Sequence, residues 1–285
     1  MNEKICMVTG ANSGIGFAAA KGLAERGAQI IMVCRNPERG EEARQELIKQ
    51  TGNERIELLI SDLSSRQSIR DMVATFKGRF DRLDVLVNNA GGTFAQRQTT
   101  VDGVEMTFAL NYLAPFLLTH LLLDKLKVSK AARIVNVASV MQAKQLDLDG
   151  AIDPTQYSSF GAYRTAKLAV IMMTYYMSEH LAPNGITVNA LHPGVIYTPQ
   201  ATRSVPAFIR PLLKLFMRSP EQSASLILHL AAASEAGEIS GKYFSGANQT
   251  VQTVPVSYDA NLQRKLYDQS LAWTGLSPRE YSAHI

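Results

Sequence analysis

A tyrosine and a lysine stand four residues apart in a stretch of helical pattern. Tyr163 and Lys167 are therefore expected on one face of a helix that covers residues 161–181. A tyrosine hydroxyl ordinarily has a pKa of about 10, and a neighbouring ammonium lowers that pKa by stabilising the phenolate. Such a hydroxyl could exchange a proton closer to neutral pH. The pair alone is common by chance and usually structural, so its setting decides what it does.

Two further polar residues fit a site that exchanges protons. Ser139 follows an apolar run at residues 132–138, and its hydroxyl could bond a substrate carbonyl or alcohol; a turn or helix cap is the alternative. Asn111 lies inside a long helical stretch at residues 103–127, where asparagine is a poor helix former. A polar kink that holds a water and relays protons to Lys167 would explain this residue, and so would a plain buried hydrogen bond.

A glycine-rich turn joins the first apolar run to the first helical pattern. It reads Thr-Gly-Ala-Asn-Ser-Gly-Ile-Gly over residues 9–16. The glycines let the backbone approach a pyrophosphate, and the helix N-terminus offers free amides and a positive dipole end. A plain tight turn is the alternative, but the position after the first strand favours dinucleotide binding. The contacts expected here are Gly10, Asn12, Ser13, Gly14, Ile15 and Gly16.

The end of the second predicted strand distinguishes between the two nicotinamide cofactors. An acidic side chain there would bind the ribose 2′-hydroxyl of NAD and repel the 2′-phosphate of NADP. Residues 33–36 read Val-Cys-Arg-Asn and contain no acid. Arg35, with Asn36 beside it, could form a charge-assisted contact to a phosphate, although a solvated arginine is the alternative. We therefore expect NADP(H).

Two more segments end predicted strands at the carboxyl edge of the sheet, where ligands of open α/β sheets bind. Asp62 and Leu63 follow the third strand, and Asp62 could bond the adenine amino group or cap the next helix. Asn-Asn-Ala-Gly at residues 88–91 ends the fourth strand and suits a backbone that passes close to a cofactor. A structural role between neighbouring strands fits equally. The cofactor contacts expected in this segment are Asn89, Ala90 and Gly91.

In their order along the chain, these motifs resemble the short-chain dehydrogenase/reductase family. The matching pieces lie at residues 9–16, 88–91, 111, 139, 163–167 and 193–194, and the likeness runs from about residue 4 to residue 245. The resemblance implies that Tyr163 is the acid and base and that Ser139 orients the substrate. It also implies that Lys167 stabilises the phenolate and binds ribose, while Asn111 holds a water.

The same resemblance assigns residues 193–198 to the nicotinamide end of the cofactor. It implies that Pro193 and Gly194 bind the cofactor, that the backbone near Val195 contacts the nicotinamide, and that Thr198 anchors the carboxamide. Residues 199–219 contain many apolar side chains among prolines and basic residues. We expect them to form a small helical insertion that shapes the substrate pocket together with residues 140–162. A lid or a subunit contact is the alternative.

A closer likeness is to the retinol dehydrogenase group. It rests on residues 33–36, on Leu-His-Pro-Gly-Val at 191–195 and on Ser-Gly-Lys-Tyr-Phe at 240–244. The likeness implies NADP(H) and a hydrophobic alcohol or carbonyl as substrate. A double-bond reductase similar to protochlorophyllide reductase is the alternative within the family. A non-catalytic NADP-binding sensor or scaffold is the alternative outside enzymes, and the presence of all four candidate catalytic residues argues against it.

Apolar runs alternate with helical patterns along most of the chain, which predicts a doubly wound, Rossmann-type α/β fold. Runs that are apolar throughout predict a parallel sheet covered on both faces. We expect one domain over residues 1–285, because no linker or repeat occurs. Strands are expected at residues 5–9, 29–34, 55–61, 83–88, 132–138, 186–191 and 242–244. Helices are expected at residues 14–27, 37–50, 65–80, 103–127, 161–181, 221–233 and 258–274.

Composition narrows the remaining classes of function. Hydrophobic residues make up 46% and charged residues 19%, as in ordinary globular proteins. The net charge of +4 comes from scattered basic residues, so no nucleic-acid partner is expected. Cys6 and Cys34 lie in apolar runs, and no Cys/His cluster has metal-ligand spacing.

The predicted location and assembly rest on weaker signals. No signal peptide precedes the first strand, and the most apolar stretch, residues 116–123, is short of the roughly 20 residues of a membrane span. We therefore expect a cytoplasmic protein with no membrane span. The family likeness implies a homodimer or homotetramer formed through the helices at residues 103–127 and 161–181.

Overall fold

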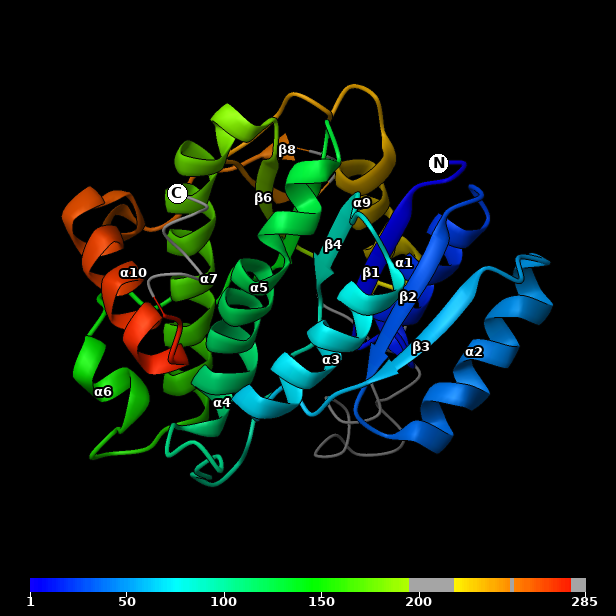
Figure 1. Cartoon of the computed structure of the whole chain (residues 1–285). Coiled ribbons are helices and arrows are strands. Elements are labelled where there is room, and N and C mark those ends of the chain that lie inside the picture. The colour runs from blue at the N-terminus through cyan, green and yellow to red at the C-terminus, as the bar shows by residue number, and fades with distance from the viewer. Residues whose placement is uncertain (195–217, 247–248, 278–285) are drawn as a thin grey trace, which may run out of the picture.

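A single eight-stranded sheet runs through the computed structural model, which describes residues 1–194, 218–246 and 249–277 (Figure 1). The strand order is β3-β2-β1-β4-β5-β6-β7-β8; the first seven strands are parallel and β8 is antiparallel to β7. The strands are β1 Ile5–Thr9, β2 Gln29–Cys34, β3 Ile56–Ile60, β4 Val85–Asn88, β5 Arg133–Val137, β6 Thr187–His192, β7 Tyr243–Ser245 and β8 Gln249–Thr250.

Helices cover both faces of this sheet. They are α1 Gly14–Ala24, α2 Pro37–Thr51, α3 Arg66–Arg79, α4 Met106–Phe108, α5 Ala114–Val128, α6 Leu148–Ile152, α7 Ser159–Leu181, α9 Pro220–Ala232 and α10 Ala260–Thr274. Alternation along β1 shows why both faces are buried. Met7 packs in the cluster formed with α3, α5 and α7, whereas Cys6 and Val8 pack on the opposite face with α1, α2 and α9.

The doubly wound parallel fold predicted from the apolar runs is confirmed. Strands β1 and β2 have the predicted bounds, and the other predicted strands differ by one or two residues at their ends. Among the strands and α-helices of the described residues, two were not predicted. Helix α6 lies in the connection at residues 140–162, and β8 is a pair of exposed residues with no apolar pattern to mark it.

The long helix predicted at residues 103–127 is interrupted. Helix α4 is followed by one π-helical turn, η1 (Ala109–Leu113), and then by α5. A π turn adds one residue to the usual helical spacing and is rare outside functional sites. Asn111 lies in this turn, so the predicted kink around it is present.

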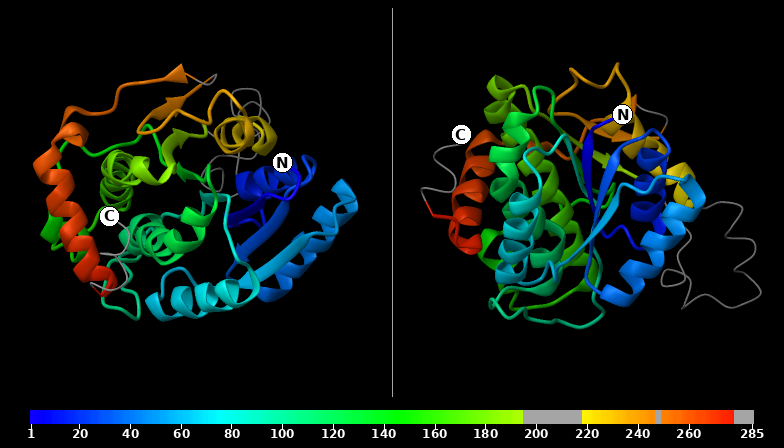
Figure 2. Two further views of the ribbon diagram at one scale, coloured as in Figure 1. Left: turned by 45° about the horizontal axis from the view of Figure 1, so that its top comes forward. Right: turned by 45° about the vertical axis from the view of Figure 1, so that its right-hand side comes forward.

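The C-terminal helix α10 packs against the outer side of α7 and η1 (Figure 2). Tyr267 of α10 stacks on Tyr176 of α7 with ring centroids 4.5 Å apart, and it meets Phe116 of α5 edge-on at 5.3 Å. The family likeness predicts a subunit contact through the two long helical segments that contain α5 and α7. The contact with α10 covers one face of these helices. A homodimer through that face would have to include α10.

The helical run Met106–Val128 meets the length and composition of a membrane-crossing helix, and within the described residues it is alone in doing so. Its most apolar 18-residue window has a mean hydropathy of 1.5. However, 83% of that window is buried inside the protein, where α5 packs on α3 and β4. The expectation that no stretch reaches the length of a membrane span is therefore wrong for this helical run, although most of the run is buried inside the protein.

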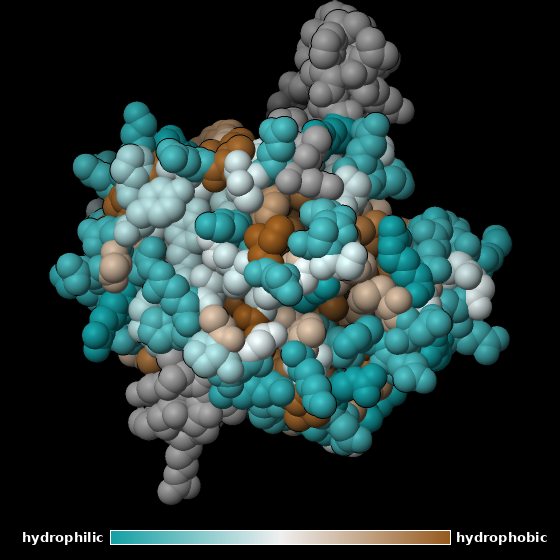
Figure 3. Space-filling model, turned by 90° about the horizontal axis from the view of Figure 1, so that it is seen from above, coloured by the Kyte–Doolittle hydropathy of each residue, from teal (hydrophilic) through white to brown (hydrophobic). Residues whose placement is uncertain are grey.

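The two edges of the sheet, at the amino and carboxyl ends of its parallel strands, differ in the segments that lie there. The chain starts at the top of Figure 1, so the parallel strands run downward and end at the bottom. Figure 3 shows the top face, where hydrophilic residues cover most of the surface and apolar areas are small and separate. The segments predicted to bind cofactor follow the strands and therefore lie at the opposite, carboxyl edge.

Candidate active site

The glycine-rich turn lies where β1 and β4 run side by side and the strand order reverses. In sheets of this kind, a ligand binds in the crevice at that reversal. Gly10 has a φ of +67°, which favours glycine. A Cβ on Gly16 would lie 2.2 Å from the Gly10 carbonyl oxygen and 2.5 Å from Nδ2 of Asn89. Only glycine at position 16 allows this close approach.

The first turn of α1 is suited to an anion. Ser13 is the N-cap residue but its side chain makes no capping hydrogen bond, and no acidic residue lies in the first turn. The amides at this end of the helix are thus left for a ligand, and the helix dipole favours negative charge there. The cradle formed by Gly10, Gly14 and Gly16 therefore fits the pyrophosphate of a dinucleotide, and half-buried Asn12 and Ile15 flank it.

Asn89 is hydrogen-bonded to the start of the glycine-rich turn and holds it in place. Its Nδ2 donates to the carbonyl oxygen of Thr9 at 2.8 Å, and its backbone amide donates to the Thr9 hydroxyl at 2.9 Å. The amide of Ala90 donates to the same hydroxyl at 3.0 Å. The structural role between neighbouring strands is thus present, and Thr9, which the sequence did not single out, is at its centre. Gly91 is exposed at the same edge.

Arg35 is exposed at the end of β2, directly beyond buried Cys34. Burial raises the pKa of the Cys34 thiol to about 11, and the backbone amides of Ala11 and Asn12 partly oppose that rise. These contacts bring the glycine-rich turn against the end of β2, so Arg35 is beside the predicted nucleotide site. Asn36 has a structural role, because its side chain caps α2 by accepting from the Arg39 amide at 2.7 Å.

Asp62 and Leu63 follow β3 at the same edge. Asp62 accepts hydrogen bonds from the amide and hydroxyl of Ser64, at 2.9 and 2.7 Å. The cap of α3 is Ser65, so the alternative that Asp62 caps this helix is wrong; its carboxylate instead closes the preceding turn. Leu63 is buried in the core.

Lys167 and Tyr163 lie on one face of α7, as the four-residue spacing predicts. The Lys167 ammonium is 5.5 Å from the centre of the Tyr163 ring, and it donates to the carbonyl oxygen of Val137 at 2.8 Å. Lys167 is only 4% exposed, and burial lowers its pKa to about 8. The bond to β5 fixes the end of this long side chain beside the strand that leads to Ser139.

The pKa of Tyr163 departs from the sequence-based expectation. Burial raises it in the protein without cofactor, while the Ser139 hydroxyl acts in the opposite direction. The lowering of this pKa by Lys167 that the spacing predicts is not found: burial and the Ser139 hydroxyl determine the shift, and the lysine ammonium donates to Val137 instead. The Ser139 hydroxyl also accepts from the Met141 amide at 3.1 Å, so it closes a turn as well as facing Tyr163.

Asn111 reaches from the π turn to the segment after β4. Its Nδ2 donates to the carbonyl oxygens of Gly92 and Thr107, both at 2.8 Å, and its Oδ1 accepts from the Gly92 amide at 3.3 Å. A Cβ on Gly91 would lie 2.5 Å from this Oδ1 and 3.7 Å from the Lys167 Nζ. Asn111 and Lys167 therefore both lie close to Gly91. The predicted kink and the buried hydrogen bond are both present at Asn111.

The model of the short chain dehydrogenase family matches residues 4–207 of this sequence. The chain belongs to that family. Human retinol dehydrogenase 13 is 39% identical over 282 residues, covering 96% of this chain and 85% of the relative. This confirms the resemblance to retinol dehydrogenases and identifies an alcohol/carbonyl oxidoreductase that uses a nicotinamide dinucleotide.

Two solved structures superpose on this short-chain dehydrogenase and support its assignment to the family. A protein of Mycobacterium paratuberculosis superposes with a TM-score of 0.79 at 28% identity, covering 96% of this chain and 94% of that chain. The NADP active-site complex of Pseudomonas aeruginosa RhlG superposes with a TM-score of 0.71 at 26% identity, covering 86% and 95% of the two chains. Both superpositions confirm, over most of the chain, the fold that the motifs predict.

Part of the predicted nicotinamide site lies outside the described residues of this dehydrogenase. That part comprises Val195, Thr198 and most of the insertion at 199–219. Pro193 and Gly194 follow β6, and Gly194 has a φ of +92°. A Cβ there would lie 2.6 Å from Cδ of Arg218, which places this arginine against the predicted nicotinamide segment. The sequence offered no signal for Arg218, because its neighbour is 24 residues away in the chain.

Gln142 is a second residue that sequence reasoning missed. It is buried three residues after Ser139, and its Oε1 accepts from the Val254 amide at 3.2 Å. Its backbone oxygen accepts from Nε of Arg164 on α7 at 3.2 Å. Gln142 thus ties the segment after Ser139 to α7 and to residue 254. In the described part of the chain, no group of three or more His, Cys, Asp or Glu residues could hold a metal ion.

Proposed function

We propose that this short-chain dehydrogenase interconverts a hydrophobic alcohol and its carbonyl with NADP(H). The observation that carries the proposal is the placement of Tyr163 beside Ser139 and Lys167 at the sheet edge where the glycine cradle lies. When bound, the cofactor would supply or accept the hydride. The chain itself would bind the cofactor, orient the substrate and move the proton.

The proposed proton transfer depends on four side chains. In the reductive direction, the Tyr163 hydroxyl donates its proton to the substrate carbonyl oxygen, which the Ser139 hydroxyl orients. Lys167 stabilises the resulting phenolate from the same face of α7. Asn111 lies on the same side of Gly91 as the Lys167 ammonium, to which a proton would be returned. In the oxidative direction, Tyr163 takes the proton from the alcohol.

The preference for NADP over NAD rests on Arg35. The side chain is exposed at the end of β2, and residues 33–36 contain no carboxylate that would bind the ribose hydroxyl. The NADP complex of RhlG gives the same cofactor in a protein of this fold. Arg35→Asp should therefore lower kcat/KM for NADPH by about 100-fold and raise it for NADH. An unchanged ratio between the two cofactors in steady-state kinetics would contradict this assignment.

The preference for an apolar substrate rests on side chains around the reacting residues. Val140 and Met141 directly follow Ser139, and Phe160 lies in the first turn of the helix that carries Tyr163; their exposed fractions are 54, 41 and 68%. Exposed apolar side chains in the segments next to both Ser139 and Tyr163 support a binding surface for an apolar substrate. The relative named retinol dehydrogenase 13 supports the same choice. NADPH oxidation should therefore be faster with long-chain or aromatic aldehydes than with sugars, which a substrate panel measures directly.

A further inference from the structure

The orientation of Asn111 depends on how the π turn η1 is held. Its side chain bonds Gly92 and lies close to Gly91, on the side where the Lys167 ammonium lies, as described above. A rotation of this turn would move the amide away from Lys167. A π turn is less favourable than the α-helix that the flanking residues form, so neighbouring elements must stabilise it.

The support comes from α10, on the opposite side of the turn. Tyr112 directly follows Asn111, is fully buried, and its hydroxyl lies 2.7 Å from the Ser270 hydroxyl of α10. The Ser270 hydroxyl donates its own hydrogen to the Leu266 carbonyl oxygen at 2.7 Å. Tyr112 is therefore the donor to Ser270, and the hydrogen bond has a defined direction. Nearby, the Phe108 ring meets the edge of Trp273 at 5.9 Å and 81°.

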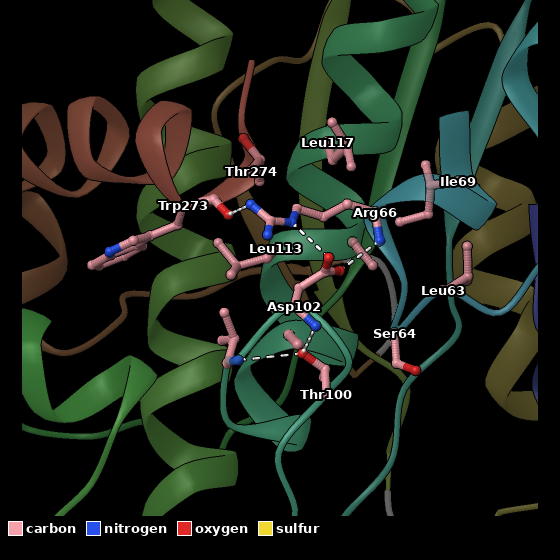
Figure 4. Close-up of a pocket in the computed structure, with 13 residues that line it drawn as sticks. Leu63, Ser64, Arg66, Ile69, Thr100, Asp102, Leu113, Leu117, Trp273 and Thr274 are labelled. Carbon is pink, nitrogen blue, oxygen red and sulfur yellow. Dashed lines mark hydrogen bonds and ion pairs between the residues drawn. The ribbon is translucent and has the colours of Figure 1, made fainter. Parts of the chain in front are cut away.

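A small pocket of about 20 Å³ lies between η1, α3 and α10, lined by Ala109, Leu113 and Trp273 among others (Figure 4). Arg66 borders it, pairing with Asp102 at 3.0 Å and donating to the Trp273 carbonyl oxygen at 3.1 Å. The contacts between α10 and this side of the turn thus include directional hydrogen bonds as well as packing.

We propose that Tyr112 and Ser270 are a positioning pair through which α10 sets the orientation of Asn111 relative to Lys167. The proposal rests on the catalytic roles proposed above for Asn111 and Lys167. It makes the C-terminal helix part of the catalytic apparatus of this chain, although no residue of α10 touches the reacting atoms.

The test compares Tyr112→Phe, Ser270→Ala and the double variant with Tyr267→Phe as the matched control. The Tyr267 hydroxyl lies 2.8 Å from Nε2 of His120 on α5, so the control also removes a hydroxyl of an α10 contact, but one away from the π turn. Each of the three test variants should lower kcat about 10-fold and leave the Kd for NADPH and the KM for substrate unchanged. The control should lose comparable stability and keep its kcat within about twofold.

The double variant separates positioning from stability. It removes both hydroxyls, so it leaves no buried donor unpaired and should recover most of the stability that Ser270→Ala loses. Under the proposal its kcat stays low, and the apparent pKa in its kcat–pH profile moves from the wild-type value. A kcat that recovers together with stability would overturn the proposal.

Asn111→Ala distinguishes failure of this proposal from failure of the proposed function. A low kcat in Asn111→Ala together with a wild-type kcat in Tyr112→Phe and the double variant would overturn the positioning pair and leave the role of Asn111 standing. A wild-type kcat in Asn111→Ala would overturn the role of Asn111 and, with it, this proposal. Low kcat in all of these variants, with normal kcat in Tyr267→Phe, supports it.

Discussion

Replacing Lys167 by methionine should change how the stability of the cofactor-free protein depends on pH. Lys167 is buried, and its pKa falls from the ordinary 10.5 to about 8. Below pH 8 the folded protein must hold a buried charge, which costs about 3 kcal/mol at pH 7. Between pH 8 and 10.5 the unfolded chain binds more protons than the folded protein, so rising pH stabilises the fold. At pH 10 the remaining cost is about 1 kcal/mol.

Lys167→Met removes this titration but also the bond to Val137, and leaving that carbonyl unpaired costs about 1 to 3 kcal/mol at every pH. The two effects nearly cancel at pH 7, so the variant should be similar to wild type or slightly more stable there. Its stability relative to wild type should then fall by about 2 kcal/mol between pH 7 and pH 10.

Urea unfolding of both proteins at several pH values measures this difference directly. Lys265→Met, which replaces an exposed lysine of α10, is the control and should show no comparable trend. A difference between Lys167→Met and wild type that stays constant from pH 7 to pH 10 would refute the account of a buried, desolvated ammonium. Turnover should be lost in Lys167→Met in either case, because the phenolate loses its stabilising charge.

Two further predictions concern the cofactor cradle and the substrate. Gly16→Ala should weaken NADPH binding at least about 10-fold in fluorescence titration, because its Cβ would lie 2.2 Å from the Gly10 carbonyl oxygen; Gly78→Ala, with open space around it, should bind normally. Phe160→Ser should raise the KM for long-chain aldehydes several-fold, in line with about 1 to 2 kcal/mol of lost apolar contact, and leave the KM for a short aldehyde unchanged. Equal effects on both aldehydes would count against an apolar binding surface.

The elements of the fold that follow from local pattern were predicted well. Strand β1 is apolar on both faces because helices cover both sides, and that signal is visible in residues 5–9. The kink at Asn111 was also predictable, because asparagine within an apolar helix is unfavourable unless its amide is bonded.

Features that depend on contacts between distant segments could not be read from the sequence. The pKa of Tyr163 is raised rather than lowered, because burial depends on packing that residue spacing does not reveal. The contact of Tyr112 with Ser270 joins residues 158 positions apart, and no local signal predicts such a pairing.

Turnover by Tyr163→Phe is the most direct test of the central claim, that this hydroxyl moves the proton. The substitution removes one oxygen from a half-buried ring and leaves the cradle at Gly10 and Gly16 untouched. The account predicts a loss of kcat of at least about 1,000-fold with an NADPH Kd within about twofold of wild type. Turnover close to the wild-type rate, with NADPH bound normally, would contradict it.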